Sequence, residues 1–431
     1  MQGGIVEPET RGNFSVPSFG KTKAFGGKKV QKRKNRVFRR IIVLTLLLFL
    51  PALAIAAEPE NPIIRDAIDK FIAAYDISGA VTVVVDKDRL LALDTIGMAD
   101  IATQKPMRPD SLFWIASMTK PLTAVSILML EDEGKLKLSD PVEKYIPEFA
   151  ALKTPSGQPA HITIEQILTH TSGLGEGDSA AIKAAHTLRE LLPIYLASPM
   201  QYEPGDRWRY TQSGINVAAR IVEVISGLSF DKFVDKRILK PLSMKDTTFY
   251  PDEKQRAHLA TPYIKDKQSG ILTAAPYADY GSSEQPPFGN AGLFSTGPDY
   301  ARFCQMLLNG GAFRGKRYLS PDAFHELTTV HTGDLPTGFL QTEEYGSRGM
   351  NYGWGIGVAI LKAPHPGVSE MLSPGTYGHG GAWGTQAWID PVRGLAYILM
   401  VQRPGINGDA STLRQAFQQA ASEAFPPAST R

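Results

Sequence analysis

Residues 386–402 read QAWIDPVRGLAYILMVQ. Two apolar segments, Gln386–Asp390 and Leu395–Gln402, flank a turn that contains proline and glycine, which is typical of paired strands. Near the other end of the sequence, Gly79–Val85 (GAVTVVV) and Leu90–Ile96 predict a second strand pair. Because strands are expected from both ends with helices between them, we predict one sheet that holds both ends of the folded chain, with an inserted helical region.

Helices are expected outside and between these strand pairs. Asn61-Pro62 resembles an N-cap followed by proline and predicts an amphipathic helix to about Tyr75. Two long stretches rich in Gly, Pro and Tyr, Thr261–Asn290 and His331–Tyr352, are expected to be loops, and loops of that length commonly line a cleft. The other helices are expected at Pro121–Gly134, Ile164–Thr169, Gly214–Ser226, Pro298–Asn309 and Ser411–Ala424.

Composition excludes several classes of function. The 431 residues are 43% apolar and 21% charged, which are ordinary values for a globular protein. Residues 1–40 hold 11 Lys or Arg and two Glu, which leaves 35 basic and 41 acidic residues in the remainder. A nucleic-acid binder needs its basic excess on the folded part, so we expect no nucleic-acid partner. The single cysteine, Cys304, excludes an intramolecular disulfide, and we expect it to be a small buried apolar residue.

The N-terminal segment predicts export. Lys28–Arg40 is densely basic, Ile41–Leu50 is apolar but for one threonine, and the small-residue run Ala52–Ala57 follows a proline. This order is typical of a secretory signal with its cleavage site. An uncleaved inner-membrane anchor is the alternative, since the apolar part reaches the lower limit of a membrane span. We expect the working protein in the periplasm or outside the cell.

The first candidate catalytic motif is Ser117-Met118-Thr119-Lys120, an S-x-x-K sequence directly before a predicted helix. The spacing places Ser117 and Lys120 on one helix face, a turn apart. A lysine takes the serine proton if burial or nearby positive charge lowers its pKa. The motif alone is weak, because an N-cap serine and a solvated lysine fit it too. The apolar flanks, Phe113–Ala116 and Leu122–Val125, favour a buried lysine.

Two further segments carry side chains suited to the same chemistry. Tyr210, within Trp208–Gln212, can pass a proton between nucleophile and leaving group, although a single tyrosine is more often a core residue. In Tyr377–Ala382 (YGHGGA), the paired glycines allow a ligand to approach the backbone closely. The N–H of Ala382 is a candidate oxyanion donor. His379, taken alone, fits a hydrogen-bonded histidine at a strand end better than a functional one.

In this order, the motifs resemble the serine β-lactamase and penicillin-binding-protein superfamily, in particular its class C β-lactamase-related esterases and peptidases. The family order S-x-x-K, Tyr-x-Asn, then Lys-Thr-Gly or His-x-Gly is matched by Ser117/Lys120, Tyr210 and His379–Gly381. Accessory segments match over roughly residues 60–425, namely Leu128–Phe149, Ile167–Leu174, Gly289–Gly311, Tyr352–Gly355 and Ala387–Pro391.

The resemblance implies a mixed α/β (α+β) fold class, in which an antiparallel sheet flanked by helices lies beside an all-helical domain, with the site between them. Residues 1–57 would be the basic region and signal peptide or anchor. Residues 58–431 would be a β-lactamase-like serine hydrolase domain with an inserted helical subdomain.

The resemblance also implies a role for each matched residue. Ser117 would be acylated, Lys120 would help to deprotonate it, and Tyr210 would relay protons. The N–H groups of Ser117 and Ala382 would form the oxyanion hole. The remaining residues expected to contact substrate are Gln212, His379, Gly380 and Gly381.

Two departures from the family pattern change the expected substrate. Gln212 stands where the family most often has asparagine, so contact with a substrate amide or with Lys120 differs by one methylene. His379 and Gly380 replace the lysine and the hydroxyl residue that help to bind the carboxylate of a β-lactam. We therefore expect an exported serine hydrolase that cleaves esters, or amides, through an acyl-enzyme on Ser117. Candidates for an apolar acyl pocket are Trp114, Trp383 and Tyr202, although core packing explains each of them as well.

Two alternatives use the same residues. The first is a D-amino-acid or peptidoglycan peptidase, or a weak class C-type β-lactamase. The second is a non-catalytic penicillin-binding-like sensor, which the joint presence of Ser117, Lys120 and Tyr210 disfavours.

Other enzyme classes lack their motifs. The sequence has no G-x-S-x-G elbow, no H-E-x-x-H and no phosphate-binding glycine loop, and its eight histidines show no metal-ligand spacing. We therefore expect no metal and no cofactor, and a small-molecule ester, amide or peptide substrate.

Overall fold

The computed structural model describes residues 59–277, 280–337, 351–365, 369–406 and 411–426. The chain divides into Met1–Ile55 and Ala56–Arg431, and every described residue belongs to the second part. The predicted signal segment therefore lies outside the described residues. Within the described ranges, no single helix is long and apolar enough to cross a membrane, and one bent pair, Ser213–Ser226 with Phe230–Leu239, meets the criteria by length and composition alone.

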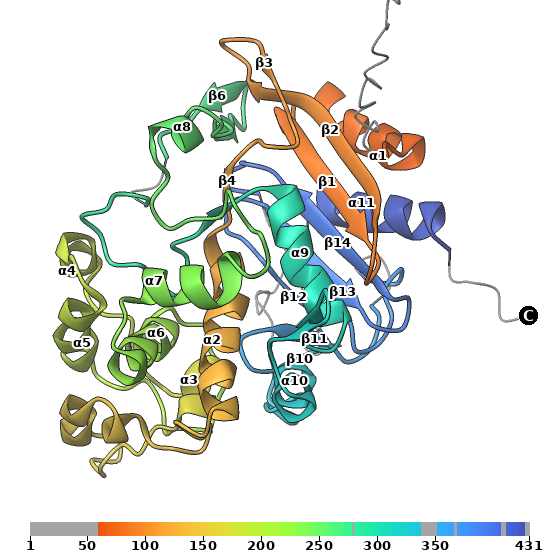
Figure 1. The fold of residues 1–431 in the computed structure, drawn as a ribbon. Helices are drawn as coiled ribbons and strands as arrows, with labels where there is room; N and C mark the ends of the chain where they lie inside the picture. The colour runs from red at the N-terminus through yellow and green to blue at the C-terminus, as the bar shows by residue number, and fades with distance from the viewer. Residues whose placement is uncertain (1–58, 278–279, 338–350, 366–368, 407–410, 427–431) are drawn as a thin grey trace, which may run out of the picture. The chain divides into compact units, whose positions relative to one another are not determined.

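An eight-stranded antiparallel sheet forms the centre of the fold (Figure 1). Its first long strand pairs with its last, with Val83 opposite Ile398, which confirms the predicted sheet built from both ends. The strands run in the order β10 (Tyr352–Trp354), β11 (Ala359–Leu361), β12 (Tyr377–Gly380), β13 (Gln386–Asp390), β14 (Leu395–Met400), β1 (Gly79–Val85), β2 (Leu90–Asp100) and β3 (Lys105–Pro106).

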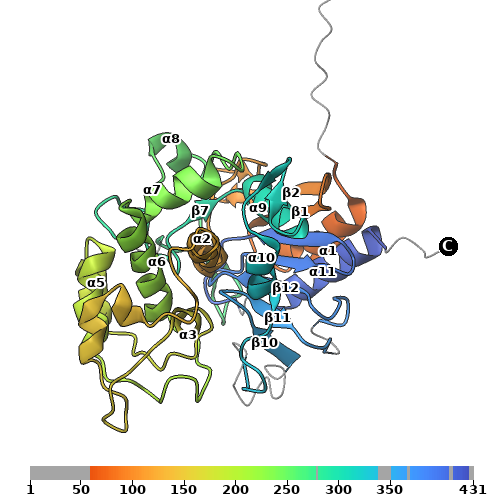
Figure 2. The same cartoon turned by 60° about the horizontal axis from the view of Figure 1, so that its bottom comes forward.

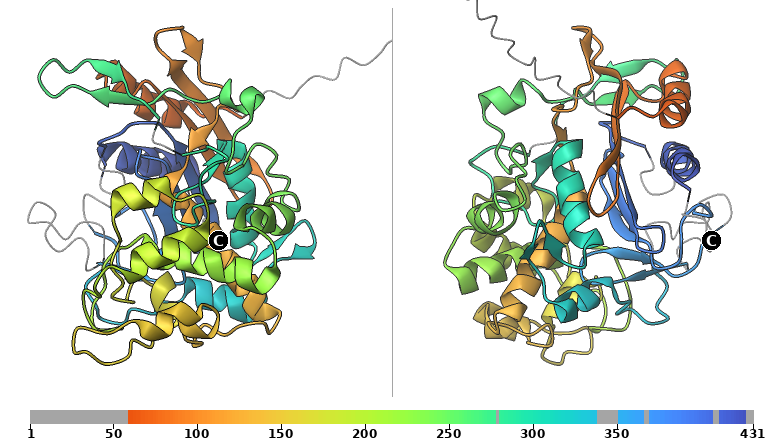
Figure 3. Two further views of the ribbon diagram at one scale, coloured as in Figure 1. Left: turned by 90° about the vertical axis from the view of Figure 1, so that its left-hand side faces the viewer. Right: turned by 45° about the vertical axis from the view of Figure 1, so that its right-hand side comes forward.

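Helices cover both faces of this sheet, as the turned views show (Figures 2 and 3). On one face lie α1 (Pro62–Ala73), which Asn61 caps, and α11 (Thr412–Ala424). On the other lies α9 (Gly297–Leu308). Because β1 is buried on both faces, its sequence is apolar apart from Thr82 and does not alternate between apolar and polar residues.

A helical region lies beside α2 (Lys120–Asp132), which occupies the middle of the molecule (Figure 2). Every residue of α2 from Lys120 to Leu130 is buried, because the helix packs against the sheet layer and the helical region at once. That region consists of α3 (Ile164–Leu168), α4 (Ser179–Ala184), α5 (Leu188–Leu196), α6 (Ser213–Ser226) and α7 (Phe230–Val234).

The remaining elements are short. They are η1 (Ala116–Thr119), η2 (Val142–Lys144), η3 (Pro147–Ala151), η4 (Asp235–Leu239), α8 (Glu253–Arg256), α10 (Pro321–Thr328), β4 (Phe113–Trp114), β5 (Tyr263–Lys265), β6 (Leu272–Ala274), β7 (Phe294–Ser295), β8 (Ala312–Phe313) and β9 (Lys316–Arg317).

The mixed α/β class is confirmed, but one predicted loop is wrong. Thr261–Asn290 contains the hairpin β5–β6, whose turn is closed by Asp266 accepting the backbone N–H groups of Gln268 and Ser269. Strands of three residues are too short to show an alternating pattern, so the sequence concealed them. Most of the other predicted loop, His331–Tyr352, lies outside the described residues.

Candidate functional site

Ser117 is the only residue between Ser111 and Leu130 that is not buried. It lies in the single turn η1, just before α2 begins at Lys120. Its predecessor Ala116 has a φ of 45°, a left-handed conformation that is strained for a residue other than glycine. A backbone hydrogen bond holds the segment just before this turn, since the N–H of Ile115 donates to the carbonyl of Leu293. The fold thus presents one hydroxyl from an otherwise buried segment.

Lys120 is fully buried, as its apolar flanks predicted, so a solvated surface lysine is excluded. Its Nζ lies 2.9 Å from Ser117 Oγ, 2.9 Å from Gln212 Oε1 and 3.0 Å from the carbonyl oxygen of Asn290. Burial holds the pKa of Lys120 well below its ordinary value, and the charge of Glu176 opposes that shift. The amine is therefore far easier to deprotonate than a lysine in water.

The partners of Lys120 orient its lone pair. A neutral amine has two N–H bonds and one lone pair. The oxygens of Gln212 and Asn290 are carbonyl oxygens and only accept, so both N–H bonds donate to them. The third direction, toward Ser117 Oγ, is left to the lone pair. In the neutral state, Lys120 is placed to accept the proton of the Ser117 hydroxyl.

Tyr210 and His379 lie next to this pair. The Tyr210 ring centre is 4.6 Å from Lys120 Nζ, and its hydroxyl is 3.4 Å from His379 Nε2. His379 Nδ1 lies 2.6 Å from the Gly380 carbonyl, which only accepts, so Nδ1 carries the hydrogen and Nε2 accepts from Tyr210. Burial, with a smaller contribution from Lys120, lowers the pKa of His379 to about 3. The imidazole is therefore neutral at physiological pH.

The end of β12 lies against the turn that carries Ser117. A β-carbon on Gly381 would come within 2.0 Å of Thr385 Oγ1 and 2.7 Å of the Ile115 carbonyl. This glycine therefore allows close packing of the chain on itself, and the expectation that it lets a ligand approach the backbone stays a prediction. Gly380 pairs with Gln386 in the sheet, and Ala382 is exposed just beyond the strand. Its role as an oxyanion donor stays a prediction.

Gln212 and Asn290 form a pair in front of Lys120. Asn290 Nδ2 donates to Gln212 Oε1 over 2.9 Å, and the same oxygen accepts from Lys120. Of the two roles that the Gln212 departure left open, contact with the lysine is therefore present. Sequence reasoning did not single out Asn290, although it lies in the family-like stretch Gly289–Gly311.

His170 was also missed as a site residue, although it lies in the family-like stretch Ile167–Leu174. It is fully buried and has a φ of 62°. Its carbonyl accepts from the N–H of Arg209 at 3.0 Å, and its Nδ1 accepts from the N–H of Thr211 at 3.2 Å. Its ring centre is 4.6 Å from that of Tyr210. His170 therefore holds the backbone on both sides of Tyr210 and the ring itself.

An aromatic cluster begins one residue beyond Ala382. Trp383 is half-buried, and its ring centre lies 4.7 Å from that of Trp114 and 5.8 Å from that of Tyr277. Trp114 is buried and donates its indole N–H to the Ala291 carbonyl. Tyr202 is not part of this cluster, because it packs on the helical side with its hydroxyl on the His170 carbonyl. Of the three proposed lining residues, only Trp383 keeps a partly open face.

Two other features concern cysteine and possible metal ligands. Cys304 is buried, as expected, and burial raises the pKa of its thiol. In the described part of the chain, no three His, Cys, Asp or Glu side chains are grouped to hold a metal ion.

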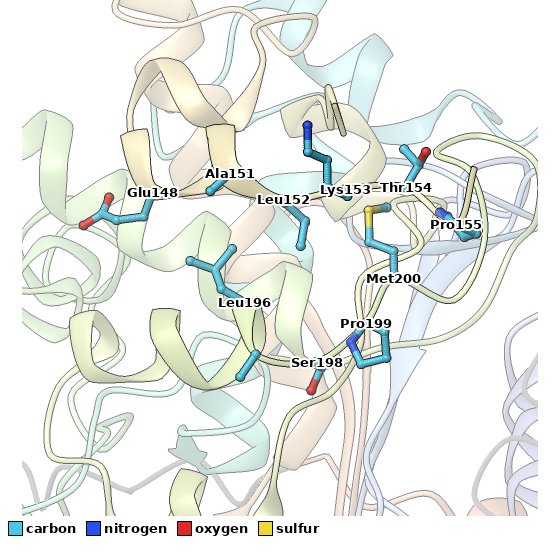
Figure 4. Close-up of a pocket in the computed structure, with 11 residues that line it drawn as sticks. Glu148, Ala151, Leu152, Lys153, Thr154, Pro155, Leu196, Ser198, Pro199 and Met200 are labelled. Atoms are coloured by element: carbon cyan, nitrogen blue, oxygen red, sulfur yellow. The ribbon is translucent and has the colours of Figure 1, made fainter. Parts of the chain in front are cut away.

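A hollow of about 410 Å³ lies on the helical region and contains none of the predicted site residues (Figure 4). Its lining residues are Glu148, Ala151, Leu152, Lys153, Thr154, Pro155, Leu196, Ala197, Ser198, Pro199 and Met200.

The fold is that of a β-lactamase-like serine hydrolase, and Ser117, Lys120 and Tyr210 lie together in it. The family model described as "Beta-lactamase" matches residues 64–422, so the chain belongs to the beta-lactamase family. Protein Rv1367c of Mycobacterium tuberculosis (strain ATCC 25618 / H37Rv) is 34% identical over 366 residues, which cover 78% of this chain and 88% of that protein.

Two further proteins are similar to this chain. Esterase EstB of Burkholderia gladioli is 27% identical over 365 residues, which cover 77% of this chain and 88% of the esterase. Among solved structures, EstCE1, "a hydrolase with promiscuous acyltransferase activity", superimposes with a TM-score of 0.71 at 20% identity, over 83% of this chain and 97% of EstCE1. The latter likeness concerns the fold alone.

Proposed function

We propose that this protein hydrolyses esters whose acyl group carries no charge, through an acyl-enzyme on Ser117. The observation that carries the proposal is the buried Lys120 Nζ, 2.9 Å from Ser117 Oγ and bonded otherwise to two carbonyl oxygens. Neutral Lys120 takes the hydroxyl proton as Ser117 Oγ bonds to the ester carbonyl carbon. The oxyanion is stabilised by the N–H groups of Ser117 and Ala382.

The second half of the reaction returns the protons. As the C–O bond to the alcohol breaks, the leaving oxygen takes a proton through Tyr210, which Lys120 resupplies. Water then attacks the acyl group, gives its proton back to the same pair, and Ser117 Oγ leaves as the hydroxyl. Because Lys120 and Tyr210 are in contact, their protons titrate as a pair rather than one by one.

The proposed preference for an uncharged acyl group rests on His379. Where β-lactamases hold a lysine that attracts the substrate carboxylate, this chain has an imidazole whose pKa is lowered to about 3 by burial. A neutral group gives no ionic attraction for an anion, and the half-buried face of Trp383 beside Ala382 suits an apolar acyl group instead. The similarity to EstB, an esterase, supports this choice. Action outside the cytoplasm belongs to the same proposal and is supported by the signal-like segment within residues 28–57.

The test compares the purified protein with Ser117→Ala on p-nitrophenyl butyrate, a chromogenic cephalosporin and a D-Ala-D-Ala peptide. We expect ester turnover that falls by at least about 10³-fold in Ser117→Ala, with little cephalosporin cleavage. Ser126→Ala, which alters a serine of the following helix α2 that donates to the Leu122 carbonyl, is the matched control and should leave ester turnover unchanged.

Each contrary outcome has its own meaning. Preferred cleavage of the cephalosporin or the peptide would overturn the ester assignment and keep the nucleophile. Equal ester turnover in Ser117→Ala and the unaltered protein would overturn the nucleophile itself.

A further inference from the structure

Helix α6 begins differently from α1, α5, α9 and α11. α1, α5, α9 and α11 each have a cap residue whose own side chain accepts a backbone N–H. At α6 the cap residue is Gln212, and its side chain makes no such bond. That side chain is directed instead to Lys120 Nζ, 2.9 Å away.

A carboxylate from a distant part of the sequence caps α6 in its place. The N–H of Gln212 donates to both oxygens of Glu176, at 2.7 and 2.9 Å, and the N–H of Ser213 donates to Oε2 at 3.0 Å. A negative group at a helix N-terminus also interacts favourably with the helix dipole. Glu176 therefore does what a cap side chain at residue 212 would otherwise have to do.

The backbone around Glu176 is closely packed on the end of α5. A β-carbon on Gly175 would come within 2.6 Å of Ser198 Cβ. Gly177 has a φ of +80°, and a β-carbon there would come within 2.9 Å of Ile194 Cγ2. The packing therefore requires both glycines. It also fixes the backbone position of Glu176, which lies between them.

We propose that Glu176 is a positioning residue of the active site: by capping α6 it frees and orients the Gln212 side chain that holds Lys120, and its charge faces the Lys120 amine. The role rests on the proposed function, in which Lys120 is the base. It assigns Glu176 no contact with substrate.

The charges around Lys120 make the second part of this role measurable. Among the described residues, the titratable groups that interact with Lys120 are Tyr210, His170, His379 and Glu176. Burial lowers the pKa of both histidines far enough to keep them neutral near pH 7. The carboxylate of Glu176 raises the pKa of Lys120 against the effect of burial, so its removal destabilises the Lys120 ammonium.

The experiment compares Glu176→Gln with Glu190→Gln, using p-nitrophenyl butyrate from pH 5 to 9. Glu190 also accepts a backbone N–H at the start of a helix, that of His186, and is exposed. For Glu176→Gln we expect kcat to fall about 10-fold with KM within twofold, and the acid limb of kcat/KM to move to lower pH by about one unit. Glu190→Gln should match the unaltered protein.

A double-mutant cycle tests whether Glu176 acts through Gln212. Once Gln212→Ala has removed the side chain that Glu176 orients, adding Glu176→Gln should lower kcat by less than threefold. Thermal unfolding of each variant separates loss of fold from loss of geometry.

The proposal is overturned if Glu176→Gln resembles Glu190→Gln, if its kcat falls only in step with its melting temperature with an unmoved acid limb, or if the two substitutions are additive. Failure of the proposed function is seen separately, as ester turnover that survives Ser117→Ala.

Discussion

The start of α2 and the end of β12 each bury a basic side chain, yet they surround it with different partners. Lys120 has two carbonyl oxygens, a hydroxyl and the charge of Glu176 around it. His379 has one carbonyl and the Tyr210 hydroxyl. Desolvation lowers both pKa values. Burial alone therefore makes a neutral base, and the neighbours determine what that base does.

β-Lactamases combine a base that serves the nucleophilic serine with a cation that attracts the substrate carboxylate. In this chain the two are separated. The α2 end keeps a lone pair aimed at a serine, which is the chemistry of acyl transfer. At the β12 end the chain has a neutral imidazole in place of the family lysine, and in the proposed function this group gives no ionic attraction for a substrate carboxylate. Tyr210 contacts both ends and joins them.

The largest effect is expected at the α2 end. Lys120→Met keeps an unbranched side chain of similar length but has no lone pair for the serine proton, so kcat/KM for p-nitrophenyl butyrate should fall by about 10³–10⁴-fold. Steady-state kinetics at pH 7.5 measure this. The exposed Lys153, altered to methionine, is the control. A loss of less than 10-fold in Lys120→Met would transfer the role of base to another group and remove the contrast with His379.

Tyr210→Phe should have an intermediate effect. The ring stays in place against His170, while the hydroxyl that serves the leaving group is lost, so kcat should fall about 10²-fold with a melting temperature within a few degrees of the unaltered protein. Esters with a better leaving group depend less on protonation of that group, so their kcat should fall less in Tyr210→Phe. If p-nitrophenyl and ethyl esters are affected equally, Tyr210 is not the proton donor to the leaving group.

The smallest effect on catalysis is expected at His379. Its substitution should be easier to detect in the pH dependence of the free energy of unfolding than in the kinetics. In His379→Gln the amide oxygen replaces Nε2 as acceptor for Tyr210, so ester kcat/KM should fall less than about 10-fold. Unfolded histidine binds a proton near pH 6.5, whereas folded His379 does so only at about 3. The unfolded state thus binds more protons as the pH falls, and the free energy of unfolding should decrease below pH 6.5 by up to about 1.4 kcal/mol per unit.

The measurement is the free energy of unfolding by denaturant at several pH values between 6.5 and 4. The decrease should be less steep in His379→Gln, although His170 contributes in the same direction and remains. His325, which is exposed, gives the control variant His325→Gln, with the slope of the unaltered protein. Identical slopes in all three proteins would show that His379 is not held neutral by the fold.

Part of this site was predictable from the sequence because its signals are local. The apolar residues on both sides of Lys120 predicted its burial, and the helix directly after the motif set its distance from Ser117. The hairpin β13–β14 was visible because its two apolar segments flank a turn with proline and glycine.

The rest depends on contacts between distant segments. Glu176 lies 36 positions before Gln212 in the sequence, and no periodicity links a carboxylate to a helix that begins so far away. The clamp of His170 on Arg209 and Thr211 is formed by a carbonyl and a ring nitrogen across the fold. The close approach of Gly381 to the Ile115 carbonyl joins segments far apart in the sequence, so no local pattern showed it.

The pairing of β1 with β14 has a consequence for the chain while it is being synthesised. GAVTVVV is made near the beginning, but one of its edges has no partner until Leu395–Met400 has been synthesised. Until then it is an uncharged strand, rich in valine, that is paired with β2 along one edge and open along the other, the kind of edge that recruits other chains. Pairing over so long a stretch of sequence is also slow to form. Truncated or stalled chains that end before Leu395 should therefore aggregate through residues 79–85, and the last strand acts as the cover that ends this exposure.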